Sequence, residues 1–172
     1  MNKESLFWLV ITLSSLAALG FLLGQSDGEP PFNSADERHA IADDCIGSHS
    51  GIDRHDHAQL RISVLGSFIE IPGDVGLNDG DCTMRPLHTH SGDGRIHAEY
   101  RDNTTVLPLE AFFDTWGKHM DKSGFDDYRI DSSHEFLMFV TEEGGERTQV
   151  DTFGEHVIED GQLIELIYRA VE

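Results

Sequence analysis

The chain has 172 residues, of which 32 are acidic (Asp or Glu) and 12 are basic (Lys or Arg), so its formal net charge is −20. This length suits one domain with a short appendage. The negative charge argues against a nucleic-acid partner, because it repels the phosphate backbone. The 10 histidines are the second unusual feature of the composition, and they are the more informative one.

An apolar segment lies near the start of the chain. Residues 6–23 contain no charged side chain, and as a helix they would extend over ~27 Å, enough to cross the hydrocarbon core of a bilayer. We predict a signal anchor, that is, a transmembrane helix over residues 1–25 with the membrane as its partner; a cleaved signal peptide is the alternative. In both cases the rest of the chain lies outside the cytoplasm, at the cell surface or in a periplasm.

A polar linker over residues 26–38 is predicted to separate the anchor from an extracytoplasmic domain over residues 39–172. The two cysteines of the chain, Cys45 and Cys82, fall in this domain. In an oxidising compartment they are expected to form a disulfide. The alternative is a thiolate metal ligand, because Cys82 lies six residues before His88.

Alternating apolar residues predict two hairpins and a final strand. The first hairpin covers Leu60–Pro72, with Gly66 and Ser67 at its tip, so that Val64 would pair with Ile69. The second hairpin and the final strand are expected at residues 136–141, 146–150 and 163–168.

One globular helix is predicted over Leu109–His119. Its apolar residues recur at the spacing of a single helix face, and we interpret this aromatic stripe as core: Leu109, Phe112, Phe113 and Trp116. One helix among several hairpins predicts an α+β fold, in which the amphipathic helix packs on a mostly antiparallel sheet in a β-grasp-like arrangement. The predicted transmembrane helix precedes this domain.

The segment that follows the first hairpin carries two pairs of metal-ligating residues. His88 and His90 are two residues apart, and so are His97 and Glu99. On strands, such pairs point to the same side. A turn over residues 91–94 would place His88 opposite His97 and His90 opposite Arg95, with opposed Cβ atoms ~4.5–5.5 Å apart. Imidazoles at this separation can converge on one metal ion.

A second His-x-His pair, His55 and His57, comes just before the first hairpin and would point away from the core. The predicted metal site therefore comprises His55, His57, His88, His90, His97 and Glu99. Three or four of these side chains would be ligands, and the others would orient them by hydrogen bonds. The remaining histidines are expected to have structural or surface roles: His39, His49, His119, His134 and His156.

The ligand types favour copper, then zinc, with iron as a further possibility. Met84 and Met120 lie close to histidines in the sequence and would suit copper. The leading hypothesis is a protein for metal handling or delivery to a metal acceptor or membrane protein complex. One alternative is a metal-dependent enzyme with an open coordination position, in which Glu99 acts as the base. The other is a non-catalytic accessory subunit of a membrane complex.

The chain from His55 to Lys118 resembles a family of exported or membrane-anchored, mostly uncharacterised bacterial and archaeal proteins. The shared pattern is H-x-H near the first strand, L-H-T-H at Leu87–His90, I-H-x-E at Ile96–Glu99 and L-x-x-F-F-x-x-W-G at Leu109–Gly117. This sequence departs from the pattern at the helix start, where Pro108 replaces a capping Ser or Thr. The resemblance implies a metal-site domain and no particular activity.

Overall fold

The computed structural model describes residues 38–171. The predicted anchor over residues 1–25 and the linker up to residue 37 lie outside the described residues. In the described part, 41% of the residues are in strands and 11% are helical. No helix among residues 38–171 is long and apolar enough to cross a membrane.

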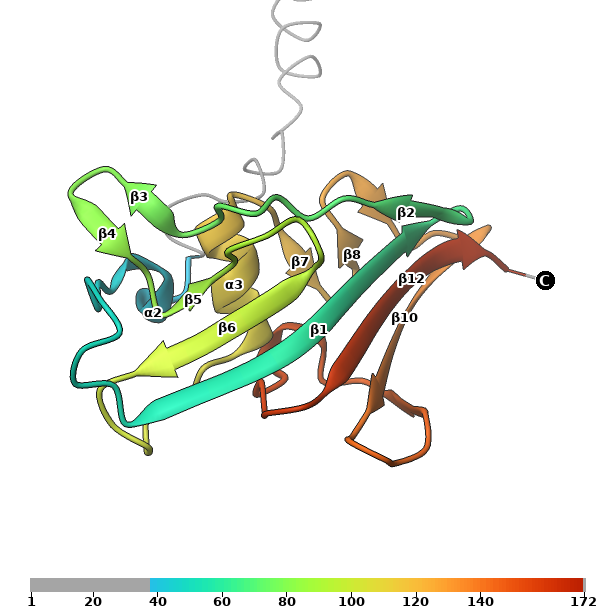
Figure 1. Ribbon diagram of the computed structural model, residues 1–172. Coiled ribbons are helices and arrows are strands. Elements are labelled where there is room, and N and C mark those ends of the chain that lie inside the picture. Colours follow the sequence, from blue (N-terminus) through green and yellow to red (C-terminus); the bar gives the residue numbers. More distant parts are fainter. Residues whose placement is uncertain (1–37, 172) are drawn as a thin grey trace, which may run out of the picture. The chain divides into compact units, whose positions relative to one another are not determined.

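One large mixed sheet dominates the fold (Figure 1). Its strand order is β11-β10-β12-β1-β6-β5, and β2 pairs with the second half of β1. Only β1 and β12 run parallel, and the other pairs are antiparallel. The strands are β1 (Arg54–Val64), β2 (Ser67–Ile69), β5 (Leu87–His88), β6 (Arg95–Tyr100), β10 (His134–Thr141), β11 (Thr148–Val150) and β12 (Leu163–Ala170).

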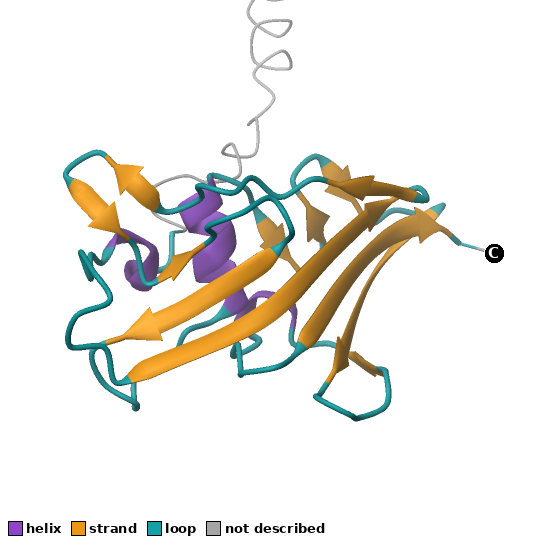
Figure 2. Ribbon diagram, viewed as in Figure 1, coloured by secondary structure: helices purple, strands orange, loops and turns teal. Residues whose placement is uncertain are grey.

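Smaller elements surround this sheet (Figure 2). They are β3 (Leu77–Asp79) paired with β4 (Cys82–Met84), the three-stranded group β7 (Met120–Asp121), β8 (Gly124–Phe125) and β9 (Tyr128–Arg129), and the helices α2 (Ala40–Asp43), α3 (Leu109–Trp116) and η1 (Phe153–Glu155). Helix α3 lies against one face of the large sheet, where the core forms.

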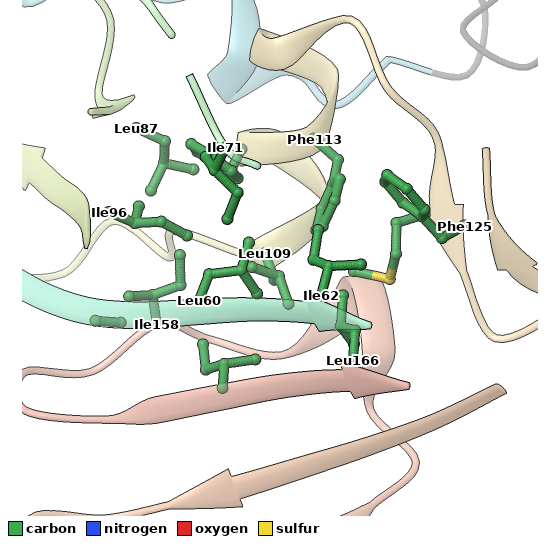
Figure 3. Close-up of a cluster of buried hydrophobic side chains, with 14 of the residues drawn as sticks. Leu60, Ile62, Ile71, Leu87, Ile96, Leu109, Phe113, Phe125, Ile158 and Leu166 are labelled. Carbon is green, nitrogen blue, oxygen red and sulfur yellow. The ribbon is translucent and has the colours of Figure 1, made fainter. Parts of the chain in front are cut away.

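The core lies between α3 and the inner face of the large sheet (Figure 3). Along β1, the residues Ala58, Leu60, Ile62 and Val64 are buried, and the residues between them are not. Phe113 of α3 is also fully buried, as the aromatic stripe predicted. Burying one such large side chain stabilises a fold by ~1.5–3 kcal/mol. Because side chains alternate along a strand, the odd-numbered residues of β1 face the opposite side of the sheet.

The predicted α+β, β-grasp-like fold class is wrong, because the described chain is mostly β. The globular helix is confirmed but is short: α3 ends at Trp116, and Gly117 takes a left-handed conformation with φ of 73°. The chain after it forms two-residue strands in β7, β8 and β9 instead of a further helical turn. Strands this short contain no repeat of apolar residues, so periodicity could not reveal them.

The first hairpin is confirmed, but its register differs from the prediction. The turn is Leu65–Gly66, and Ile62 pairs with Ile69, whereas the prediction paired Val64 with Ile69. Both turn residues have positive φ, 50° and 82°, as a type I′ turn requires. A leucine at such a position gives no turn signal in the sequence. The second hairpin and the final strand lie where they were expected.

Candidate metal centre

The outer face of the sheet brings histidines from three strands into one row. His57 of β1 pairs with His97 of β6, and His97 pairs with His88 of β5. In the next row, His55 pairs with Glu99. The predicted His88–His97 pairing is therefore confirmed, and the two His-x-His pairs meet because β1 and β6 are neighbours in the sheet.

His90 joins this row by a different route from the one predicted. Strand β5 ends at His88, so His90 does not pair with Arg95 in the sheet. The chain turns, and His90 Nε2 lies 3.2 Å from His88 Nε2. The ring of His90 is also close to that of His97, with 4.6 Å between the ring centroids. The side chain thus reaches the predicted neighbours without the predicted strand pairing.

His49 is the site residue that sequence reasoning missed, since we expected a structural or surface role for it. It lies in the loop between α2 and β1, and its Nδ1 is 2.8 Å from Glu99 Oε2. Its ring lies 5.6 Å from that of His90, between centroids. The sequence contains one hint, which is the nearby Cys45: a disulfide at that position restricts where the loop can lie.

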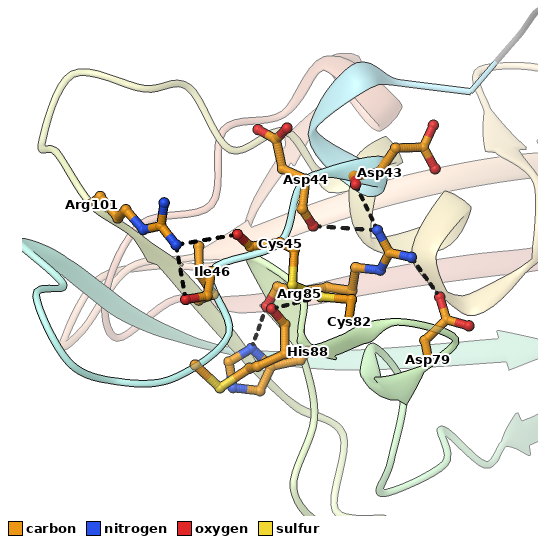
Figure 4. Close-up of a disulfide and its surroundings, with 10 residues drawn as sticks. Asp43, Asp44, Cys45, Ile46, Asp79, Cys82, Arg85, His88 and Arg101 are labelled. Atoms are coloured by element: carbon orange, nitrogen blue, oxygen red, sulfur yellow. Dashed lines mark hydrogen bonds and ion pairs between the residues drawn. A yellow bond between two sulfur atoms is a disulfide. The ribbon is translucent and has the colours of Figure 1, made fainter.

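The predicted disulfide between Cys45 and Cys82 is confirmed, with 5.7 Å between the two Cα atoms. Both thiols are therefore used, and neither is a metal ligand. The disulfide joins the His49 loop to β4, and the backbone N–H of Ile46 donates to Met84 O over 3.0 Å. Figure 4 shows that Arg85, the residue after β4, donates hydrogen bonds to the backbone oxygens of Asp43 and Asp44, where α2 ends and this loop begins. These contacts hold His49 over the outer face of the sheet.

Glu99 lies at the centre of this arrangement and is fully buried. Its ion-pair partners among residues 38–171 are all histidines. Oε2 is 2.8 Å from His49 Nδ1, and Oε1 is 2.9 Å from His55 Nε2, 3.6 Å from His97 Nδ1 and 4.0 Å from His88 Nε2. Among the described residues, Glu99 Oε1 and His97 Nδ1 are buried without a hydrogen-bond partner. Leaving such groups unsatisfied costs ~1–3 kcal/mol each.

The histidines differ in how far they are buried. His88 is fully buried, whereas the side chains of His49 and His55 are 53% and 48% exposed. Burial lowers the pKa of His88 from 6.5 to about 4, and burial together with neighbouring imidazoles lowers the pKa of His97 to about 4. Both rings are therefore neutral at pH 7, the state in which imidazole binds a metal.

The cluster of His49, His55, His57, His88, His90, His97 and Glu99, hereafter the histidine cluster, contains three sets of residues whose ligand atoms lie within 4.8 Å of one another. The sets are His49–His88–His90, His55–His57–His97 and His88–His97–Glu99. Metal bonds of ~2.0–2.2 Å place two ligand atoms of one ion at most ~4.4 Å apart. The donor types therefore suit a metal ion, and side-chain shifts of a few tenths of an ångström bring even a separation of 4.8 Å within reach of one ion.

The other four histidines have structural contacts away from this cluster. His39 caps α2 by accepting from the backbone N–H of Ile41. His119 lies 3.2 Å from Asp121, His134 lies 3.0 Å from Asp131, and His156 contacts Gln162. Met120, considered above as a soft ligand, packs in the hydrophobic core.

No protein-family profile, curated protein or solved structure matches the chain. The family resemblance described above therefore stays a prediction. The disulfide is typical of proteins from oxidising environments outside the cytoplasm, and the histidine cluster can hold a metal.

Proposed function

We propose that this protein binds a transition metal ion through the histidine cluster, for metal handling outside the cytoplasm. One observation carries the proposal: in the part of the chain that the structure describes, a fully buried carboxylate has only imidazole nitrogens as ion-pair partners, at 2.8–4.0 Å. A buried carboxylate requires a compensating charge. The neutral imidazoles of His88 and His97 do not supply it, and a metal cation bound by the cluster would.

The donor set supports copper first and zinc second. Imidazole and carboxylate suit copper(II), zinc and iron, and affinity for such sites rises from iron to copper and falls again at zinc. Both thiols are used in the disulfide, Met120 packs in the core, and Met84 is a buried residue of β4 outside the histidine cluster. The set therefore favours copper(II) over copper(I), which prefers sulfur ligands.

The exposure of the cluster supports reversible binding. His88 and Glu99 form a buried floor, while His49 and His55 lie at the surface with about half of each side chain exposed. An acceptor can approach the ion from that side and exchange ligands with it. We propose that residues 6–23 anchor the domain at a membrane, so that a membrane protein is the acceptor.

The test is the metal content of the full-length chain, purified with its disulfide intact, stripped with a chelator and reconstituted separately with copper(II), zinc(II) and iron(II). Elemental mass spectrometry after desalting should find stoichiometric copper, and zinc with lower affinity. The variant H88A/H97A should retain less than a tenth of that metal, because it removes the buried imidazole of His88 and the largely buried one of His97.

The matched control is H134A/H156A, which removes two histidines outside the cluster and should bind as much metal as the wild type. Circular dichroism should show that both variants keep the strand-rich fold. Absence of stoichiometric metal in the wild type, or equal metal in H88A/H97A, would overturn the proposed function.

A further inference from the structure

We infer that the histidine cluster is a two-ion centre, in which three histidines bind each ion and Glu99 bridges the pair. This inference rests on the proposed function, because it concerns the same side chains. It adds a second ion and a specific role for the carboxylate.

Two of the three candidate sets share no residue. One set is His49–His88–His90 and the other is His55–His57–His97. The first set comes from the α2–β1 loop, β5 and the turn after β5, and the second comes entirely from the paired strands β1 and β6. Each set alone supplies the three protein ligands of an open transition-metal site.

The two oxygens of Glu99 are divided between these sets. Oε2 lies 2.8 Å from His49 of the first set. Oε1 is nearest to the second set, at 2.9 Å from His55 and 3.6 Å from His97, and is 4.0 Å from His88 of the first set. A carboxylate placed in this way gives one oxygen to each ion. The separation of two metals bridged in this manner is ~3.5–4 Å in known two-metal sites.

A single ion would engage only part of the histidine cluster. The third set, His88–His97–Glu99, can hold one ion, but it leaves four neighbouring imidazoles without a ligand role. It also takes one histidine from each of the other sets. The contact between the two sets is close, with 5.2 Å between the ring centroids of His88 and His97, as expected where two ions share one bridging residue.

The test is a copper(II) titration of the full-length protein, followed by elemental analysis and by electron paramagnetic resonance. We expect two equivalents per chain and a half-field transition from coupled copper ions. The variants H49A/H90A and H55A/H57A each remove one set and should each bind one equivalent, with an uncoupled copper signal. E99Q should lose the half-field transition.

The control H134A/H156A should keep two equivalents and the coupled signal. One equivalent in the wild type, without the half-field transition, would overturn the two-ion centre and leave the proposed function intact. No stoichiometric metal would overturn the proposed function as well. Two equivalents that persist in H49A/H90A would place the second ion elsewhere and contradict the bridge.

Discussion

Two glutamates on the same face of the large sheet have opposite surroundings. Glu165 of β12 is half-buried and forms an ion pair with Arg147, whose guanidinium also lies over the Phe139 ring. Glu99 of β6 is fully buried, and all its ion-pair partners are histidines. Within residues 38–171, a permanently charged arginine pairs with the first carboxylate, and no lysine or arginine pairs with the second. This difference supports the proposal that a bound metal ion balances the charge of Glu99.

The largest predicted effect comes from removing the disulfide that holds His49 beside Glu99. The variant C45A/C82A should lower the free energy of unfolding by ~3–4 kcal/mol, as expected for a closed loop of this length. Urea unfolding of the metal-free protein measures this loss. The variant should also bind copper more weakly, because the His49 loop is no longer held to β4. Unchanged affinity would contradict a ligand role for His49.

Replacing the buried carboxylate is predicted to have the next largest effect. E99Q should weaken copper binding by ~100-fold. Removing a hydrogen-bond partner of a metal ligand typically costs ~10–100-fold in affinity, and Glu99 contacts several of these ligands. Competition with a chelator of known affinity measures it. The matched control is E165Q on the same sheet face, which should change copper affinity less than twofold. Equal losses in the two variants would contradict the contrast between the glutamates.

The pH dependence of the metal-free protein follows from the low pKa values of His88 and His97. In the unfolded chain the two imidazoles become protonated below pH 6.5. In the folded chain they become protonated only near pH 4. Stability should therefore rise with pH through this window, and it should fall as the pH drops from 6.5 to 4. The loss should be at least ~2 kcal/mol, since one pKa unit corresponds to ~1.4 kcal/mol.

Urea unfolding at pH 4.5 and at pH 7 tests this dependence. H97Q should reduce the difference by about half, because it removes one of the two titrating rings. H156Q is the control, because His156 contacts the neutral side chains of Thr152 and Gln162, and it should reduce the difference far less than H97Q. A wild-type protein that is equally stable at both pH values would contradict the burial argument.

The smallest predicted effect is at the other glutamate. E165Q should destabilise the fold by less than ~1 kcal/mol, because its partner Arg147 is partly exposed and such pairs contribute little. Thermal unfolding measures this change. A larger loss would show that Glu165 is as critical to its surroundings as Glu99 and would weaken the comparison.

Much of the histidine cluster could be predicted from spacing. A period of two residues puts His55 with His57, and His97 with Glu99, on the same face of a strand. The turn after His90 brings His88 opposite His97, as the structure has it. These relations join residues that are close together along the chain, and such relations can be worked out from the sequence alone.

The rest depends on contacts between distant segments. The pairing of β1 with β6, which aligns His57 with His97, joins residues 40 positions apart. His49 reaches Glu99 only because a disulfide and backbone hydrogen bonds fix its loop. The fold class was wrong for a related reason: several strands have only two or three residues and take their conformation from their neighbours.

The most direct test of the central claim is X-ray absorption spectroscopy of the copper-loaded, full-length protein. The account predicts several imidazole ligands with metal–nitrogen distances of ~2.0 Å, no sulfur ligand, and loss of the imidazole scattering in H88A/H97A. A spectrum with only oxygen ligands, or imidazole scattering that is unchanged in that variant, would show that the histidine cluster is not the metal site.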